Sequence, residues 1–160
     1  MKAIKTILLI LAAISFINVI GAGLYEHIAA IPRWKLAPPS SLTMFQGQYG
    51  INPGAFWQKI HPVTLVLLIA ALVANWKTGR RKYIFITIAG YAIAIGVTFL
   101  YFVPELLSII HTAYQPTVDQ GLVSRANVWE KLSIVRLVYC IGLASILLFS
   151  LTKEDHYKEN

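Results

Sequence analysis

Residues 60–103 read IHPVTLVLLIAALVANWKTGRRKYIFITIAGYAIAIGVTFLYFV, which is two apolar runs on either side of a short basic turn. Each run is close to the roughly 20 residues that an α-helix needs to cross about 30 Å of hydrocarbon. The turn at 75–82 is short, so the two helices must lie antiparallel. The stretch therefore predicts a transmembrane helical hairpin.

Two further apolar runs, Ile7–Tyr25 and Leu132–Leu151, flank this hairpin in the sequence. The chain is 57% hydrophobic and 13% charged, which is too apolar for an ordinary soluble protein of 160 residues. Backbone polar groups need partners in lipid, and the alternating pattern of a barrel is absent, so the runs must be helices. We predict an all-α, single-domain integral membrane four-helix bundle over residues 1–160. The expected helices are about 5–27, 60–76, 82–104 and 128–152, joined by two long extracytoplasmic loops.

The first apolar run also has some features of a secretory signal. Lys2 and Lys5 precede it, and the small residues 21–23 end it. Because the run is longer than the core of a signal peptide, we interpret it as a retained helix.

Basic residues are distributed unevenly along the chain. Eight lie near the termini or in the turn at 75–82, and five lie in the long loops. By the positive-inside rule, both termini are then cytoplasmic in a bacterial-type inner (plasma) membrane, and the long loops face outward. The basic turn also suits nucleic acid or anionic lipid, but we interpret it as a topology signal and expect no nucleic-acid partner. The members of this turn cluster are Lys77, Arg80, Arg81 and Lys82.

Small and polar residues recur at helical spacing along the third helix. This stripe indicates either a seam where another helix packs closely or a polar crevice, and both interpretations stay open. The lone Cys140 excludes an intrachain disulfide and is expected to be a packing residue. The tryptophans near the helix ends are expected to form aromatic belts. The stripe consists of Tyr83, Thr87, Gly90, Ala94, Thr98, Tyr101 and Glu105.

Ionisable residues gather at the predicted outer end of the bundle: Glu26, His27, His61, Glu105 and His111. Such groups are rare in membrane segments and commonly mark functional sites. Arg136 lies about 10 Å inside the fourth helix and needs a partner there. We expect either an ion pair with Glu105 or a bound anionic substrate.

Histidine suits both proton transfer and metal ligation. His27 and His61, with Glu26, predict a mixed histidine and carboxylate metal site, and two histidines can also ligate haem iron. No diagnostic spacing such as HExxH supports either site. Trp57 lies one turn from His61 on the same face, and Trp129 shares a face with Arg136. We therefore include both tryptophans with the histidines as cofactor-binding candidates.

The second half of the chain, about Thr98–Leu151, carries Pro104 after an aromatic helix end. Trp129 and Arg136 then lie seven residues apart at the start of the fourth helix. With four helices and a long first outer loop, this layout resembles the anthrone oxygenase-like membrane family. The resemblance implies a similar scaffold, and characterised members are implicated in oxygenating polycyclic aromatic phenols. In this chain Glu105 follows the proline, where the family commonly has asparagine.

The leading hypothesis is a membrane oxidoreductase with an outward-facing site that acts on a lipophilic or aromatic small molecule. In one version of this hypothesis the site binds haem or a transition metal. Its catalytic candidates are His61, Glu105 and Arg136. The alternative is a non-enzymatic accessory subunit whose outer loops dock a partner. Transport by a homo-oligomer is less favoured, because four helices with one buried cation offer little pathway.

Overall fold

The computed structural model describes residues 2–153, and every regular element in that range is a helix. Four of its helical segments are long and apolar enough to cross a membrane, which agrees with the predicted all-α bundle. They are Ala3–Trp34, Gly54–Ala74, Arg81–Ile110 and Gln120–Thr152, here called the first to fourth spans.

One span is a single helix, two contain a short π-helical segment, and one ends in a 3₁₀ turn. The first span comprises α1 (Lys2–Tyr25), η1 (Glu26–Ala30) and α2 (Ile31–Trp34). The second is α3 (Gly54–Ala74). The third comprises α4 (Arg81–Val97), η3 (Thr98–Phe102) and α5 (Val103–Ile110), and the fourth comprises α6 (Gln120–Phe149) and η4 (Ser150–Thr152). A 3₁₀ helix, η2 (Ser40–Phe45), interrupts the first connection.

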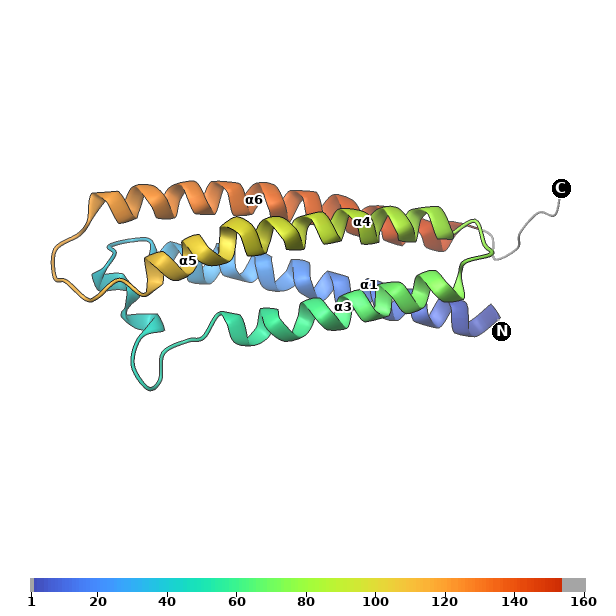
Figure 1. Cartoon of the computed structure of the whole chain (residues 1–160), viewed down its shortest axis with the longest axis horizontal. Helices are drawn as coiled ribbons and strands as arrows, with labels where there is room; N and C mark the ends of the chain where they lie inside the picture. Colours follow the sequence, from blue (N-terminus) through green and yellow to red (C-terminus); the bar gives the residue numbers. More distant parts are fainter. Residues whose placement is uncertain (1, 154–160) are drawn as a thin grey trace.

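The spans lie side by side along the long axis of the molecule (Figure 1). Helix α1 packs against α3 and α6, and α4 packs against α6 and α3. The connections 35–53 and 111–119 lie at one end of the bundle, here called the loop end (Figure 1). The turn 75–80, the start of α1 and the end of the fourth span lie at the other, here called the turn end.

Helix α6 begins earlier than the sequence indicates. The pairing of Asn127 with Glu130 predicts a start near Val128, but the helix begins at Gln120. Asp119 is its N-cap, and its carboxylate Oδ1 accepts hydrogen bonds from the backbone N–H groups of Gly121 (2.7 Å) and Leu122 (3.1 Å). The additional residues mix polar and apolar side chains, so they do not extend the apolar run that marks the predicted helix. The helix of 30 residues is about 45 Å long, which exceeds the hydrocarbon thickness.

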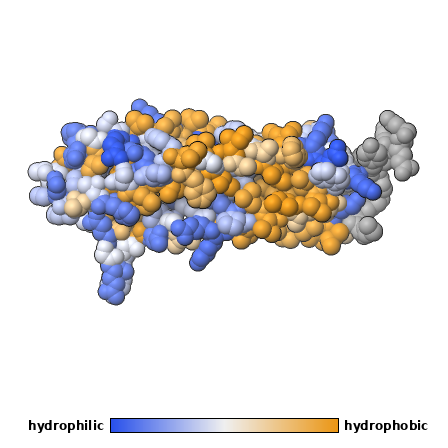
Figure 2. Space-filling model, in the orientation of Figure 1, coloured by the Kyte–Doolittle hydropathy of each residue, from blue (hydrophilic) through white to orange (hydrophobic). Residues whose placement is uncertain are grey.

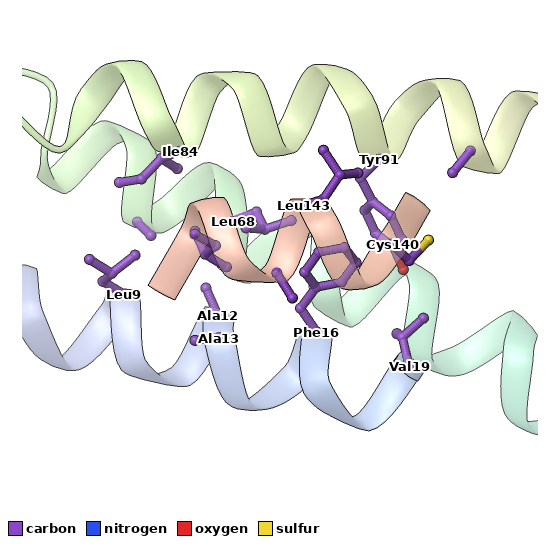
Figure 3. Packing of buried hydrophobic residues seen from close by; sticks show 14 residues of the cluster. Leu9, Ala12, Ala13, Phe16, Val19, Leu68, Ile84, Tyr91, Cys140 and Leu143 are labelled. Atoms are coloured by element: carbon purple, nitrogen blue, oxygen red, sulfur yellow. The ribbon is translucent and has the colours of Figure 1, made fainter. Parts of the chain in front are cut away.

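The inner core lies between the spans in the half nearer the turn end (Figure 3). Leu9 and Phe16 of α1, Leu68 of α3 and Tyr91 of α4 are buried there. The predicted stripe on α4 packs inward as a close seam: a Cβ added to Gly90 would lie 2.6 Å from Leu143 Cδ2. Many other large apolar side chains point outward, and Figure 2 shows them as an apolar band with polar residues on both sides.

The tryptophans divide between the two ends. Trp76 at the turn end is exposed, as an aromatic belt residue is expected to be. Trp34 and Trp129 are buried, so the belt interpretation is wrong for both of them. They belong to a second core near the loop end, here called the loop-side cluster. Its members are Ile31, Trp34, Leu42, Phe102, Ile109, Ile110, Ala126 and Trp129.

Candidate functional site

A chain of polar contacts joins the first, second and third spans on the loop-end side of the inner core. Trp57 Nε1 donates a hydrogen bond of 2.9 Å to Glu26 Oε1. The Trp57 ring stacks on His61, with centroids 5.4 Å apart and planes 22° apart. Trp57 and His61 are one turn apart on α3, as their spacing predicts. The indole thus contacts the Glu26 carboxylate through its N–H group and the His61 imidazole through its ring face.

Tyr91 continues this chain into the core. Its hydroxyl lies 2.6 Å from His61 Nδ1, and the residue is only 1% exposed. A buried tyrosine hydroxyl needs a polar partner, and His61 supplies it. The sequence interpretation missed Tyr91, although a tyrosine in the middle of an apolar run was the available signal. Tyr91 is one residue after Gly90, so it lies on a different helix face from the predicted stripe.

Arg136 occupies a site of its own between α6 and η3. Its Nη1 donates to Thr98 Oγ1 (2.8 Å), and its Nη2 donates to Ser133 Oγ (3.1 Å). The guanidinium carbon lies 4.0 Å from the centroid of the Phe102 ring, which is a cation–π contact. Its charge also interacts electrostatically with Glu26 and His61. Hydroxyls and an aromatic face therefore supply the partners that this half-buried cation requires.

The predicted ion pair between Arg136 and Glu105 is wrong. Glu105 instead binds Arg125 through two hydrogen bonds, Nε to Oε1 at 2.8 Å and Nη2 to Oε2 at 3.0 Å. Glu105 is seven residues beyond Thr98, the residue that binds Arg136. Seven helical residues correspond to about 10 Å along the axis, which separates the two sites.

Both π-helical segments lie beside this site, and both precede a proline. The N–H of Ile31 binds the carbonyl of Glu26, and the N–H of Val103 binds the carbonyl of Thr98. In each case the next residue is proline, Pro32 or Pro104, which has no N–H with which to continue the α-helical pattern. The first residue of each segment is a site residue. Single π-turns inside α-helices frequently occur at functional sites.

A cavity of about 420 Å³ lies under the first connection, between the first span, α5 and α6. Among the residues that the structure describes, Glu26 is the only charged one on its wall; Asn52 adds an amide, and the rest of the wall is apolar or aromatic. Trp129, also on the wall, donates its Nε1–H to the carbonyl of Phe102 at 2.9 Å. We call this space the loop cavity; its aromatic wall comprises Tyr25, Trp34, Phe45, Phe56 and Trp129.

His27 has different neighbours from His61. It interacts electrostatically with Arg136 and with Glu130 and Lys35, which form an ion pair with each other. Its Nδ1 atom is buried and has no hydrogen-bond partner among the described residues. The other candidate, His111, is exposed at the end of α5.

This placement gives no support to the predicted metal site of Glu26, His27 and His61. No group of three metal-ligating side chains occurs within the described part of the chain. His61 uses Nδ1 to bind Tyr91, whereas His27 interacts electrostatically with Lys35 and with Glu130 and Arg136 of α6. Haem or metal binding by His27 and His61 therefore stays a prediction.

No family model, curated protein or solved structure matches the chain. The resemblance to the anthrone oxygenase-like family therefore stays a prediction. The candidate site rests on its geometry: a largely apolar cavity with one carboxylate on its wall, held by a tryptophan that stacks on a half-buried histidine.

Proposed function

We propose that the chain is a multi-pass membrane protein that binds a lipophilic small molecule in the loop cavity, with Glu26 as its polar contact. The observation that carries this proposal is the lining of the cavity: one carboxylate, Glu26, and one amide, Asn52, on a wall that is otherwise aromatic and aliphatic. A volume of about 420 Å³ falls in the range of small-molecule sites. Such sites combine apolar walls with a few placed polar groups, as this cavity does.

Glu26 is suited to accept a hydrogen bond from the ligand. An ionised carboxylate has about four lone-pair positions, and Trp57 occupies one of them. The nearby positive charge of Arg136 opposes the cost of keeping a carboxylate in an apolar wall. A ligand with a hydroxyl group would therefore be held in one orientation, with that group at Glu26 and its apolar body against Trp34 and Trp129.

The same arrangement supports proton transfer. A carboxylate within hydrogen-bond reach of a ligand hydroxyl can act as a general base. His61, which is bound to Tyr91, stacks on the Trp57 ring and so helps to orient the indole that donates to Glu26. An oxidoreductase reaction at this site stays a prediction. An absorption spectrum with elemental analysis of the pure protein tests its haem and metal versions, and a colourless, metal-free protein would exclude both.

The proposed orientation follows from charge. We place the turn end in the cytoplasm and the loop cavity on the outer side of a bacterial-type inner membrane, because the turn end carries the excess of basic residues. The test is a C-terminal fusion to a reporter enzyme that is active only on the outer side of the membrane. Activity of this fusion would contradict the proposed orientation.

Binding can be tested with two brominated probes in lipid nanodiscs. Both 6-bromo-2-naphthol and 2-bromonaphthalene quench tryptophan fluorescence, and only the first has a hydroxyl. We expect saturable quenching by the naphthol, because Trp34 and Trp129 line the cavity. The naphthalene should bind several-fold more weakly, and Glu26→Gln should reduce this difference.

A matched pair of variants separates the cavity from the surrounding lipid. Ala30 lies on the cavity wall, whereas Ala92 is exposed on α4. Ala30→Phe should weaken the naphthol at least tenfold, and Ala92→Phe should leave binding unchanged. Quenching that does not saturate, or that is equal in both variants, would mean that the probe only partitions into lipid, and the proposal would be wrong.

A further inference from the structure

A second hollow lies at the turn end, far from the loop cavity. It has a volume of about 220 Å³ and is formed by the turn 75–80 and the start of the third span. Two aromatic and two basic residues line it: Trp76, Arg81, Lys82 and Phe85. We call it the turn groove. Trp76 and Phe85 are 53% and 57% exposed, so both rings remain available to a ligand.

Two cation–π contacts hold the basic side chains near the aromatic ones. The guanidinium of Arg81 lies 5.2 Å from the centroid of the Trp76 ring. Lys82 Nζ lies 4.9 Å from the Tyr83 ring. Such contacts restrain the side chains and leave the N–H groups of both cations free to donate to an anion.

The electrostatic surroundings of the groove favour an anion. Of the seven acidic residues in the chain, three lie in 154–160, outside the described residues. The other four, Glu26, Glu105, Asp119 and Glu130, lie in the half of the bundle nearer the loop end. The described side chains of the turn end include six basic ones: Lys5, Lys77, Arg80, Arg81, Lys82 and Lys153.

The groove also lies where polar and apolar surfaces meet. Figure 2 shows the apolar band giving way to polar residues near the turn end. Phe85 is four residues after Arg81 on α4, so it lies about one turn, or 6 Å, deeper in the direction of that band. The cations therefore sit at the rim and an aromatic ring sits below them.

We propose that the turn groove binds one anionic phospholipid, with its phosphate between Arg81 and Lys82 and the upper part of an acyl chain against Phe85. Arginine and lysine are the usual ligands of phosphate oxygens, and aromatic rings suit the boundary between headgroup and chain. A basic turn alone attracts anionic lipid without fixing its position. The aromatic walls give the lipid a defined binding position, and their apolar character favours lipid over free phosphate or nucleic acid.

Native mass spectrometry of the full chain in detergent tests this proposal. Phosphatidylglycerol and phosphatidylcholine of equal chain length are the probes, because both carry a phosphate and only the first is anionic overall. We expect one tightly retained phosphatidylglycerol, bound at least tenfold more strongly than phosphatidylcholine. Inorganic phosphate in excess should not displace it; displacement would overturn the choice of a lipid ligand.

Four variants distinguish a built site from general attraction to a basic surface. Arg81→Ala should weaken phosphatidylglycerol about tenfold, whereas Lys77→Ala removes the same charge outside the groove and should have little effect. Phe85→Ala and Trp76→Ala keep the charge and should weaken binding several-fold. Equal losses for Arg81→Ala and Lys77→Ala, or no loss for either aromatic variant, would overturn the proposal. Circular dichroism melts verify that each variant is folded.

Discussion

At the loop end, polar side chains turn inward and bind one another between the spans, whereas at the turn end most basic side chains stay at the surface beside exposed aromatic rings. Glu26, His61 and Arg136 represent the first arrangement, and Arg81 with Trp76 represents the second. Arg80 is an exception, since it is buried and ties the turn to Thr6 and to the Lys153 carbonyl. A ligand is therefore expected inside the bundle at one end and on its surface at the other.

The difference follows from where water is available. About 20 helical residues cross the hydrocarbon, so spans of more than 30 residues extend beyond it. The turn end is tight, and its cations reach the interface directly. At the loop end the long connections cover the bundle, and a polar group beneath them needs a protein partner. Buried polar contacts and a cavity consequently occur together at that end.

The largest contrast should appear between two tryptophans. Trp129→Ala removes a buried ring from the loop-side cluster and the hydrogen bond to Phe102, and should cost about 3–5 kcal/mol. Trp76→Ala removes an exposed ring at the turn end and should cost less than about 1 kcal/mol. Unfolding of both variants in detergent by a denaturant measures the difference. Equal losses would show that the loop-side cluster is not a true core.

A smaller loss of stability is expected at the contact between His61 and Tyr91, where the series of polar contacts enters the inner core. Tyr91→Phe leaves His61 Nδ1 without the hydroxyl that lies 2.6 Å away, and should cost about 1–3 kcal/mol. Tyr139→Phe is the matched control, because its hydroxyl binds the Gly90 carbonyl at 3.2 Å from a partly exposed position and should cost less. A double-mutant cycle of Tyr91→Phe with His61→Ala should show a coupling of about 0.5–3 kcal/mol. Additive losses would contradict a direct contact.

The four spans could be predicted from the sequence because lipid imposes length and hydropathy on every crossing helix. The same signal could not locate the start of α6, where polar and apolar residues alternate irregularly, or the continuation of the third span through α5, where Pro104 and Glu105 interrupt the apolar run. Asp119 was a recognisable capping residue, but Asn127 offered a competing cap closer to the apolar run. Hydropathy therefore gives the membrane part of a helix and leaves its ends to capping chemistry.

The sequence predicted several residues of the candidate site, but few of the contacts between them. The spacing of Trp57 and His61 placed both on one face, and their rings do stack. The partner of Arg136 was sought among carboxylates, whereas the hydroxyls of Thr98 and Ser133 and the ring of Phe102 fill that role. A sequence gives the approximate height of a residue along a helix, but the contacts across spans depend on the rotation of each helix, which the π-helical segments change.

The smallest predicted effect separates Arg125 from Arg136 at the loop end. Glu105 binds Arg125 near the surface, with 25% and 44% of the respective side chains exposed, so water screens the pair. A cycle of Glu105→Gln with Arg125→Gln, measured by denaturant unfolding, should give a coupling of about 0–1 kcal/mol that declines with added salt. The matched cycle of Glu105→Gln with Arg136→Gln should be additive within about 0.5 kcal/mol, because Arg136 binds Thr98, seven residues deeper. A larger coupling in the second cycle would mean that Glu105 and Arg136 form the buried pair after all, and that the inward-facing polar groups of the loop end extend to its surface.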